Sequence, residues 1–142
     1  MLPLFEEPRP PSPLAARLAA LAAEGVYLGT SSWKYQGWLG QIYTPERYFV
    51  RGRFSAKRFE SECLEEYARM FPVVCGDFSF YQFPSEVYWR RLFASAPPPL
   101  RFAFKVPEEI TCRTFPAHAR YGSRAGLANP SFLDARLLED AF

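Results

Sequence analysis

Histidine and lysine are scarce in this 142-residue chain, and its few cysteines form no recognisable motif. The single histidine, His118, cannot build a metal site with several histidine ligands. Cys63, Cys75 and Cys112 are odd in number, lie far apart and include no C-x-x-C pair, so they indicate neither a disulfide framework nor a zinc site. Reduced thiols favour a cytoplasmic location.

Other signatures are also missing. The sequence contains no G-x-G-x-x-G, no P-loop and no H-E-x-x-H, which disfavours dinucleotide, P-loop and zincin chemistry. The most apolar helical run, residues 14–23, is shorter than the ~20 residues of a membrane helix and is broken by Arg17. Glu6 and Glu7 precede the first basic residue, unlike a secretory signal. We therefore expect a soluble protein without a membrane partner.

The composition is that of a globular protein, with 49% hydrophobic and 18% aromatic residues. Seventeen basic against fifteen acidic residues leave a net charge of +2, which by itself indicates no partner. The length suits one compact domain but not a complete (β/α)8 barrel, which takes at least ~200 residues.

Hydrophobic periodicity predicts alternating helices and strands. A proline-rich arm over residues 1–13 precedes a short helix over 14–23, and residues 26–142 form the domain. We expect strands over 26–31, within 71–80 and over 100–106, helices over 59–70, 85–94 and 131–142, and irregular segments over 33–58 and 108–130. This order predicts an α/β fold with an unfinished parallel sheet.

The segment 33–58 is basic and aromatic. Its end and the start of the next helix contain Arg47, Arg51, Arg53, Lys57 and Arg58, interleaved with Tyr48, Phe49, Phe54 and Phe59. Such a stretch can follow a phosphate backbone while its rings stack on bases. The alternative is a solvated loop whose rings pack onto the domain, and we favour that alternative.

Polar and aromatic side chains follow each predicted strand. Ser31, Ser32 and Trp33 follow the first strand, Asp77 with Phe80-Tyr81 the second, and Lys105 ends the third. The carboxyl ends of parallel strands are where α/β folds place ligand-binding groups, so these residues are expected to share one cleft. Lys105 could equally be an ordinary surface lysine.

Three further patterns have simpler alternatives. Ser31-Ser32-Trp33-Lys34 matches S-x-x-K, but neither S-D-N nor K-T-G follows. Cys112 and His118 could form a thiolate pair only within hydrogen-bond reach, and an inert thiol is favoured. Cys75, inside an apolar strand, is expected to pack as a small hydrophobic residue.

Three blocks of the sequence resemble the YecE-like family, also known as domain of unknown function 72. The blocks are Leu28-Gly29-Thr30-Ser31-Ser32-Trp33 with Tyr35 and Trp38, Asp77-Phe78-Ser79-Phe80-Tyr81-Gln82-Phe83-Pro84-Ser85, and Phe102-Ala103-Phe104-Lys105-Val106-Pro107-Glu108-Glu109-Ile110-Thr111. The resemblance spans about residues 26–142. It implies a TIM barrel of about twice this length, of which the chain looks like the N-terminal part.

The resemblance also implies positions for a site, although the family's activity is not established. The motif positions at the cleft are Ser31, Trp33, Tyr35, Trp38, Asp77, Phe80, Tyr81, Lys105, Pro107 and Thr111. Cys75 stands where many members have Glu, and Cys112 where many have His. These two departures argue against conventional acid–base or metal chemistry.

The first functional hypothesis is binding of an anionic ligand, a phosphorylated metabolite or nucleic acid, at Ser31, Trp33, Tyr35, Asp77, Tyr81 and Lys105. Lys105 would neutralise the anion, Asp77 would orient it or accept a proton, and Trp33 and Tyr81 would form walls. The alternative is a truncated, inactive product that needs a partner or associates with itself through an open half barrel. No cofactor, metal or catalytic residue is indicated.

Overall fold

Three short strands form a sheet in the computed structural model, which describes residues 12–142. β1 (Gly29–Thr30), β4 (Val73–Gly76) and β5 (Arg101–Phe104) occur in the order β1-β4-β5. β1 and β4 are parallel, with Gly29 opposite Val73 and Thr30 opposite Val74. The three predicted strands are therefore present, each shorter than expected, and the fold is mixed α/β. No closed barrel forms among residues 12–142.

The chain divides into two compact units, which we describe separately. The first unit contains the described residues up to Val74 together with Ser95–Phe102. The second unit contains Cys75–Ala94 and Ala103–Phe142. The predicted arm over residues 1–13 lies mostly outside the described residues.

The first unit is built around helix α3 (Ala56–Met70), on which α1 (Pro13–Ala23) and α2 (Pro45–Tyr48) pack. The Ser12 side chain caps α1 by accepting a hydrogen bond from the amide of Ala15 at 3.1 Å. α3 begins three residues before its predicted start. Ser55 caps it, accepting from the amide of Arg58 at 3.3 Å.

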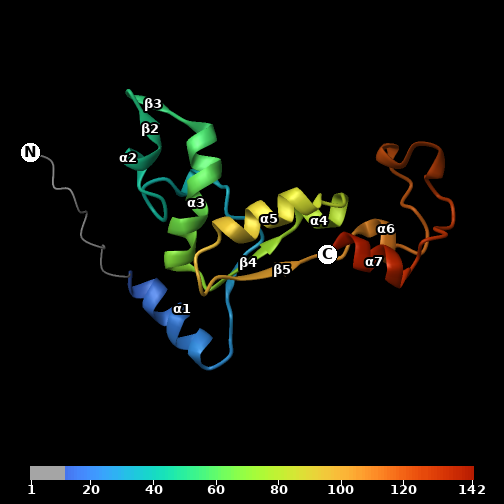
Figure 1. The fold of residues 1–142 in the computed structure, drawn as a ribbon, viewed down its shortest axis with the longest axis horizontal. Coiled ribbons are helices and arrows are strands. Elements are labelled where there is room, and N and C mark those ends of the chain that lie inside the picture. The colour runs from blue at the N-terminus through green and yellow to red at the C-terminus, as the bar shows by residue number, and fades with distance from the viewer. Residues whose placement is uncertain (1–11) are drawn as a thin grey trace, which may run out of the picture. The chain divides into compact units, whose positions relative to one another are not determined.

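The segment 33–58 is not one irregular loop, and that prediction is wrong. It contains a 3-10 helix, η1 (Gln36–Trp38), then α2, and then a hairpin of β2 (Phe49–Val50) and β3 (Arg53–Phe54). Figure 1 shows the hairpin beside the N-terminal end of α3. Tyr43 and Tyr48 are buried against Phe59 of α3, with ring centroids 5.0 Å apart in both pairs.

The second unit contains helices α4 (Phe78–Tyr81), α5 (Glu86–Ser95), α6 (Glu108–Thr111) and α7 (Ala135–Ala141), and a 3-10 helix, η2 (Ala119–Arg124). Trp89 of α5 is buried, and its ring lies 4.6 Å from that of Phe104 and 5.8 Å from that of Phe78. The segment 108–130 was expected to be irregular, but α6 and η2 occur within it. α7 starts at Ala135 rather than 131, because the Asp134 side chain caps it.

No helix among residues 12–142 is long and apolar enough to span a membrane.

Candidate functional site

Asp77 and Lys105 form an ion pair in the second unit, at the ends of β4 and β5. The Nζ of Lys105 lies 3.1 Å from Oδ1 of Asp77, and both side chains are partly exposed. The carboxylate raises the pKa of Lys105 above its usual value, because it hydrogen-bonds to the ammonium and attracts its charge. The lysine is therefore fully charged at neutral pH.

The local fold places these two side chains. Exposure alternates along β5, so Lys105 and Phe104 point to opposite faces, as the residue parity predicts. Ser79 of α4 is fully buried, and its hydroxyl lies 2.7 Å from the carbonyl oxygen of Lys105 and 3.0 Å from that of Gly76. One side chain thus connects α4 to the ends of both strands.

Cys75 belongs to the same cluster rather than to the core. Its thiol donates to Oδ1 of Asp77 at 3.5 Å, and the residue is half-buried. Burial raises the pKa of the thiol, and the hydrogen bond to the negatively charged Asp77 raises it further. We call Cys75, Asp77 and Lys105 the strand-end site.

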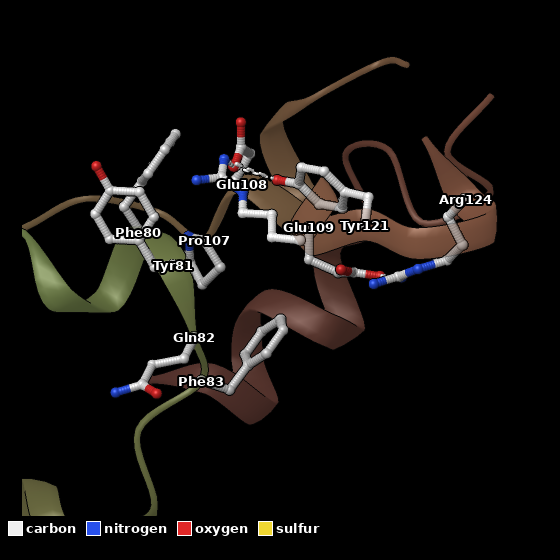
Figure 2. Close-up of a pocket in the computed structure, with 10 residues that line it drawn as sticks. Phe80, Tyr81, Gln82, Phe83, Pro107, Glu108, Glu109, Tyr121 and Arg124 are labelled. Carbon is white, nitrogen blue, oxygen red and sulfur yellow. Dashed lines mark hydrogen bonds and ion pairs between the residues drawn. The ribbon is translucent and has the colours of Figure 1, made fainter. Parts of the chain in front are cut away.

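An aromatic cavity of about 200 Å³ adjoins the strand-end site. Its lining comes from α4, α6, η2 and the residues that follow α4 and precede α6: Phe80, Tyr81, Gln82, Phe83, Pro107, Glu108, Glu109, Arg120, Tyr121 and Arg124. Figure 2 shows the labelled side chains around this space. Phe80 connects the two features, because the Nζ of Lys105 lies 5.9 Å from the centre of its ring.

Two arginine–glutamate pairs stand on the wall of the cavity. Arg120 and the hydroxyl of Tyr121 both donate to Oε2 of Glu108. The guanidinium of Arg120 also lies 5.3 Å from the ring centre of Tyr81 and 4.9 Å from that of Tyr121. Arg124 pairs with Glu109 at 2.5 Å, and Figure 2 shows these two side chains directed toward each other.

Burial and hydrogen bonding affect the titration of two of these groups. The pKa of Tyr121 is raised, chiefly by burial and then by its hydrogen bond to Glu108. The pKa of Arg120 is raised by its hydrogen bond with Tyr121. Both groups therefore stay protonated at neutral pH, so Tyr121 remains a hydrogen-bond donor and Arg120 remains a cation.

Asn129 organises the segment that supplies η2. It is buried, and its Nδ2 donates to the carbonyl oxygens of Glu109 at 2.6 Å and Cys112 at 2.8 Å. An antiparallel bridge between Thr114 and Ala128 closes the same loop. The sequence analysis did not identify Asn129, Arg120 or Tyr121. The one available signal was that this long segment contains the only asparagine of the chain.

The other three predicted site residues lie in the first unit. Ser31 and Tyr35 are exposed, whereas Trp33 is 5% exposed and its carbonyl oxygen accepts a hydrogen bond from the hydroxyl of Tyr43. Trp33 therefore packs in the core of its unit and offers little surface as a wall. Asp77, Tyr81 and Lys105 are all in the second unit.

The two catalytic alternatives gain no support from the geometry. Residues 31–35 are not helical, so the serine and lysine of the S-x-x-K match are not one helical turn apart. Cys112 and His118 have different partners: the Asn129 amide contacts the thiol at 3.7 Å, and Nδ1 of His118 accepts from the amide of Arg120 at 3.1 Å. Residues 12–142 also contain no group of three or more His, Cys, Asp or Glu that could hold a metal ion.

Comparison with known proteins identifies a family and nothing more specific. Neither a curated protein nor a solved structure matches the chain. The family described as "Protein of unknown function DUF72" matches residues 27–137, which is more than half of the chain. The match includes Asp77, Lys105 and the whole lining of the aromatic cavity, so the chain belongs to the DUF72 family.

Proposed function

We propose that the second unit binds a ligand with a phosphate or similar anionic group, a phosphorylated metabolite or a nucleic acid, at the strand-end site and the adjoining cavity. Lys105 binds the anion, Asp77 positions Lys105 and can accept a proton from the ligand, and Tyr81 forms an aromatic wall. The ammonium has three N–H donors, so its pair with Asp77 leaves donors for ligand oxygens.

One observation supports an anionic ligand more than any other: in each of three ion pairs the cation is more exposed than its carboxylate. The exposed fractions are 54% and 38% for Lys105 and Asp77, 40% and 13% for Arg120 and Glu108, and 51% and 29% for Arg124 and Glu109. Among the described ion pairs of the second unit, the one outside the cavity, Arg90 with Glu86, shows no such difference, at 77% each. On α3 of the first unit, Arg58–Glu62 (44% and 34%) and Arg69–Glu65 (64% and 48%) do show it. The charges within each pair cancel, but the positive group of each pair is the one more accessible to a ligand.

The test is isothermal titration calorimetry, in which the purified chain is titrated with inorganic phosphate. Because a charge-assisted hydrogen bond is lost, Lys105→Ala is expected to weaken phosphate binding about tenfold. Arg90→Ala is the matched control, since it also removes the cation of an ion pair in the second unit but does not line the cavity. Equal affinities for the two variants, or no binding by the unchanged chain, would contradict the proposal.

We also propose that β1, β4 and β5 are neighbouring strands of a (β/α)8-type barrel wall, in a cytoplasmic protein. The three strands are neighbours in the same order in which they occur along the chain, as in a (β/α)8 barrel. In a doubly wound sheet, by contrast, the strand order reverses at a switch point. Three free cysteines are consistent with a reducing compartment.

A barrel wall implies that the outer edges of β1 and β5 pair with further strands. Self-association would supply them, and it is favoured by Val26 and Leu28 beside β1, which are 48% and 49% exposed. Light scattering tests this, with a dimer or larger assembly as the expected mass. A strictly monomeric mass over a range of concentrations would rule self-association out.

A further inference from the structure

Two of the rings that line the aromatic cavity are largely exposed. Tyr81 is 66% exposed and Phe83 is 40% exposed. The guanidinium of Arg120 lies over Tyr81, 5.3 Å from the ring centre, so the ring keeps open surface even beside this cation. Figure 2 shows Tyr81, Phe83 and Tyr121 on different sides of the space. Exposed aromatic surface around a small cavity suits a ligand with a flat ring.

The size of the cavity limits what enters it. Its volume is about 200 Å³, whereas sites for drug-sized ligands have about 300–1,000 Å³. The cavity therefore takes one flat ring, and the rest of the ligand lies outside. The strand-end site adjoins it there, because the Nζ of Lys105 lies 5.9 Å from the centre of Phe80, which lines the cavity. A ring in the cavity and a phosphate at Lys105 can thus belong to one small molecule.

The polar side chains of the cavity wall keep hydrogen-bonding atoms for a ligand. Arg120 bonds to Glu108 and Tyr121 through Nη2 alone. Arg124 bonds to Glu109 through Nη1 alone. The remaining guanidinium nitrogens make no hydrogen bond to a described residue, and Oε2 of Glu109 has no donor in the described part of the chain. A ligand ring at this wall therefore meets both donors and an acceptor.

This combination of stacking surface and polar groups selects a type of ring. A hydrocarbon ring can stack, but it displaces water from the polar groups without replacing their hydrogen bonds, which lowers affinity. A nucleobase has donors and acceptors in the plane of its ring, so it stacks on an aromatic side chain and hydrogen-bonds along its edge. A sugar phosphate has no flat ring to stack. Of these three ligand types, a nucleobase uses both features of the cavity.

Both walls of the cavity are fixed without a ligand. The hydroxyl of Ser79 connects α4, and with it Tyr81, to the ends of β4 and β5. On the other wall, the amide of Arg120 donates to Nδ1 of His118 at 3.1 Å, and Asn129 holds the loop that contains η2. Because these contacts already order the lining, little conformational entropy is lost when a ligand binds.

We propose that the ligand of this site is a nucleoside monophosphate. Its base enters the aromatic cavity and stacks on Tyr81, the edge of the base contacts Arg124 and Glu109, and the phosphate binds Lys105. The inference rests on the proposed function, because it names the ligand of the same site. A base with a terminal phosphate also occurs at the phosphorylated end of a nucleic acid strand, and the experiment separates these two sources.

The experiment compares ligands by isothermal titration calorimetry of the full chain. The ligands are inorganic phosphate, ribose 5-phosphate, phenyl phosphate and the common nucleoside 5′-monophosphates. The best nucleotide should bind at least about tenfold more tightly than ribose 5-phosphate, because its base stacks. It should exceed phenyl phosphate by a similar factor, because the phenyl ring leaves the polar wall without hydrogen bonds.

One variant tests the stacking contact. Tyr81→Ala should weaken nucleotide binding about tenfold, while the affinity for inorganic phosphate stays the same because phosphate binds at Lys105. Phe132→Ala is the matched control, since it removes a ring of the same unit that is 39% exposed and does not line the cavity. Circular dichroism confirms that each variant is folded.

A second variant tests the polar wall. Arg124→Ala should weaken nucleotide binding about five- to tenfold and leave phosphate binding unchanged. Arg90→Ala is its control, because Arg90 is also the cation of an ion pair in the second unit but does not line the cavity.

The source of the nucleotide is tested with a 5′-phosphorylated oligonucleotide of the preferred base. The cavity holds one ring, so the additional nucleotides gain no further stacking there and the strand should bind no more tightly than the free nucleotide. Tighter binding by the strand would overturn the assignment to a free nucleotide.

Failure of this inference is distinguishable from failure of the proposed function. Suppose inorganic phosphate binds and Lys105→Ala weakens it, but no nucleotide binds more tightly than ribose 5-phosphate and phenyl phosphate: the proposed function then stands and the nucleotide is excluded. Equal nucleotide affinities of Tyr81→Ala and Phe132→Ala would likewise overturn the inference alone. Binding of neither phosphate nor nucleotide would overturn both.

Discussion

Oδ1 of Asp77 accepts from the ammonium of Lys105 at 3.1 Å, and the same oxygen accepts from a thiol, that of Cys75, at 3.5 Å. A carboxylate that is shared in this way affects its two donors differently. It stabilises the charged lysine and opposes ionisation of the thiol. The titration of Cys75 therefore reports on the state of the ion pair.

The first prediction concerns the reactivity of Cys75 in two variants. Asp77→Asn removes a negative charge that raises the pKa of the thiol, so alkylation by iodoacetamide should be faster at a given pH. Lys105→Ala removes a positive charge that lowers this pKa, so alkylation should be slower. Peptide mass spectrometry of Cys75 against pH measures both, with Glu86→Gln as a control. Shifts in the same direction would contradict the arrangement.

The second prediction concerns the buried hydroxyl of Ser79. Ser79→Ala leaves the carbonyl oxygens of Gly76 and Lys105 without this donor, which should cost about 1–3 kcal/mol of stability. Urea denaturation measures the free energy of unfolding. Ser123→Ala, at an exposed position, should change it by less than about 0.5 kcal/mol. A loss from Ser79→Ala no larger than that of the control would show that the hydroxyl does not connect the strand ends.

The third prediction concerns Asn129 and the loop that supplies η2. Asn129→Ala removes the donors to the carbonyl oxygens of Glu109 and Cys112, so the loop should open more often. Limited digestion with trypsin should then cut faster after Arg120, while cutting after Arg17 in α1 serves as the internal reference. An unchanged ratio of the two rates would mean that other contacts hold the loop.

Hydrophobic periodicity predicted the helices and strands whose apolar residues recur regularly along the chain. The strand within residues 71–80, the helix over 85–94 and the strand over 100–106 correspond to β4, α5 and β5. Alternation along β5 also predicted the side of the strand on which Lys105 lies. Asp77 and Lys105 were expected to be close because the carboxyl ends of parallel strands lie at one edge of a sheet, and they form an ion pair. Their role in binding stays a prediction.

Contacts between distant residues explain what the sequence analysis missed. The segment 33–58 is ordered because Tyr43 and Tyr48 pack on Phe59, and a single-sequence pattern does not show which ring will find which partner. The aromatic cavity likewise depends on Asn129, which bonds residues up to 20 positions away. We expect Trp33 in the site because it follows a strand, but its side chain is buried in the core of the first unit.

The last prediction concerns alkaline pH and the buried tyrosines of the first unit. Burial raises the pKa of Tyr43 and Tyr48 far above the ordinary value, and the hydrogen bond from Tyr48 to the Glu66 carboxylate adds to the effect. In the unfolded chain these hydroxyls ionise near pH 10. The folded state then binds more protons than the unfolded state, so the stability contributed by each group is complete below about pH 10 and declines above it.

The rate of this decline identifies the groups responsible. Each buried tyrosine that stays protonated should lower the free energy of unfolding by about 1.4 kcal/mol per pH unit above about pH 10. Tyr48→Phe removes one such group, so the free energy of unfolding should fall less steeply with pH. At neutral pH the same variant should be less stable by about 1–3 kcal/mol, because the buried Glu66 loses a donor while keeping those of Thr44. Urea denaturation between about pH 8 and 11 measures both effects. An unchanged slope would mean that Tyr48 ionises in the folded protein, and that the Glu66 network does not exclude its charge.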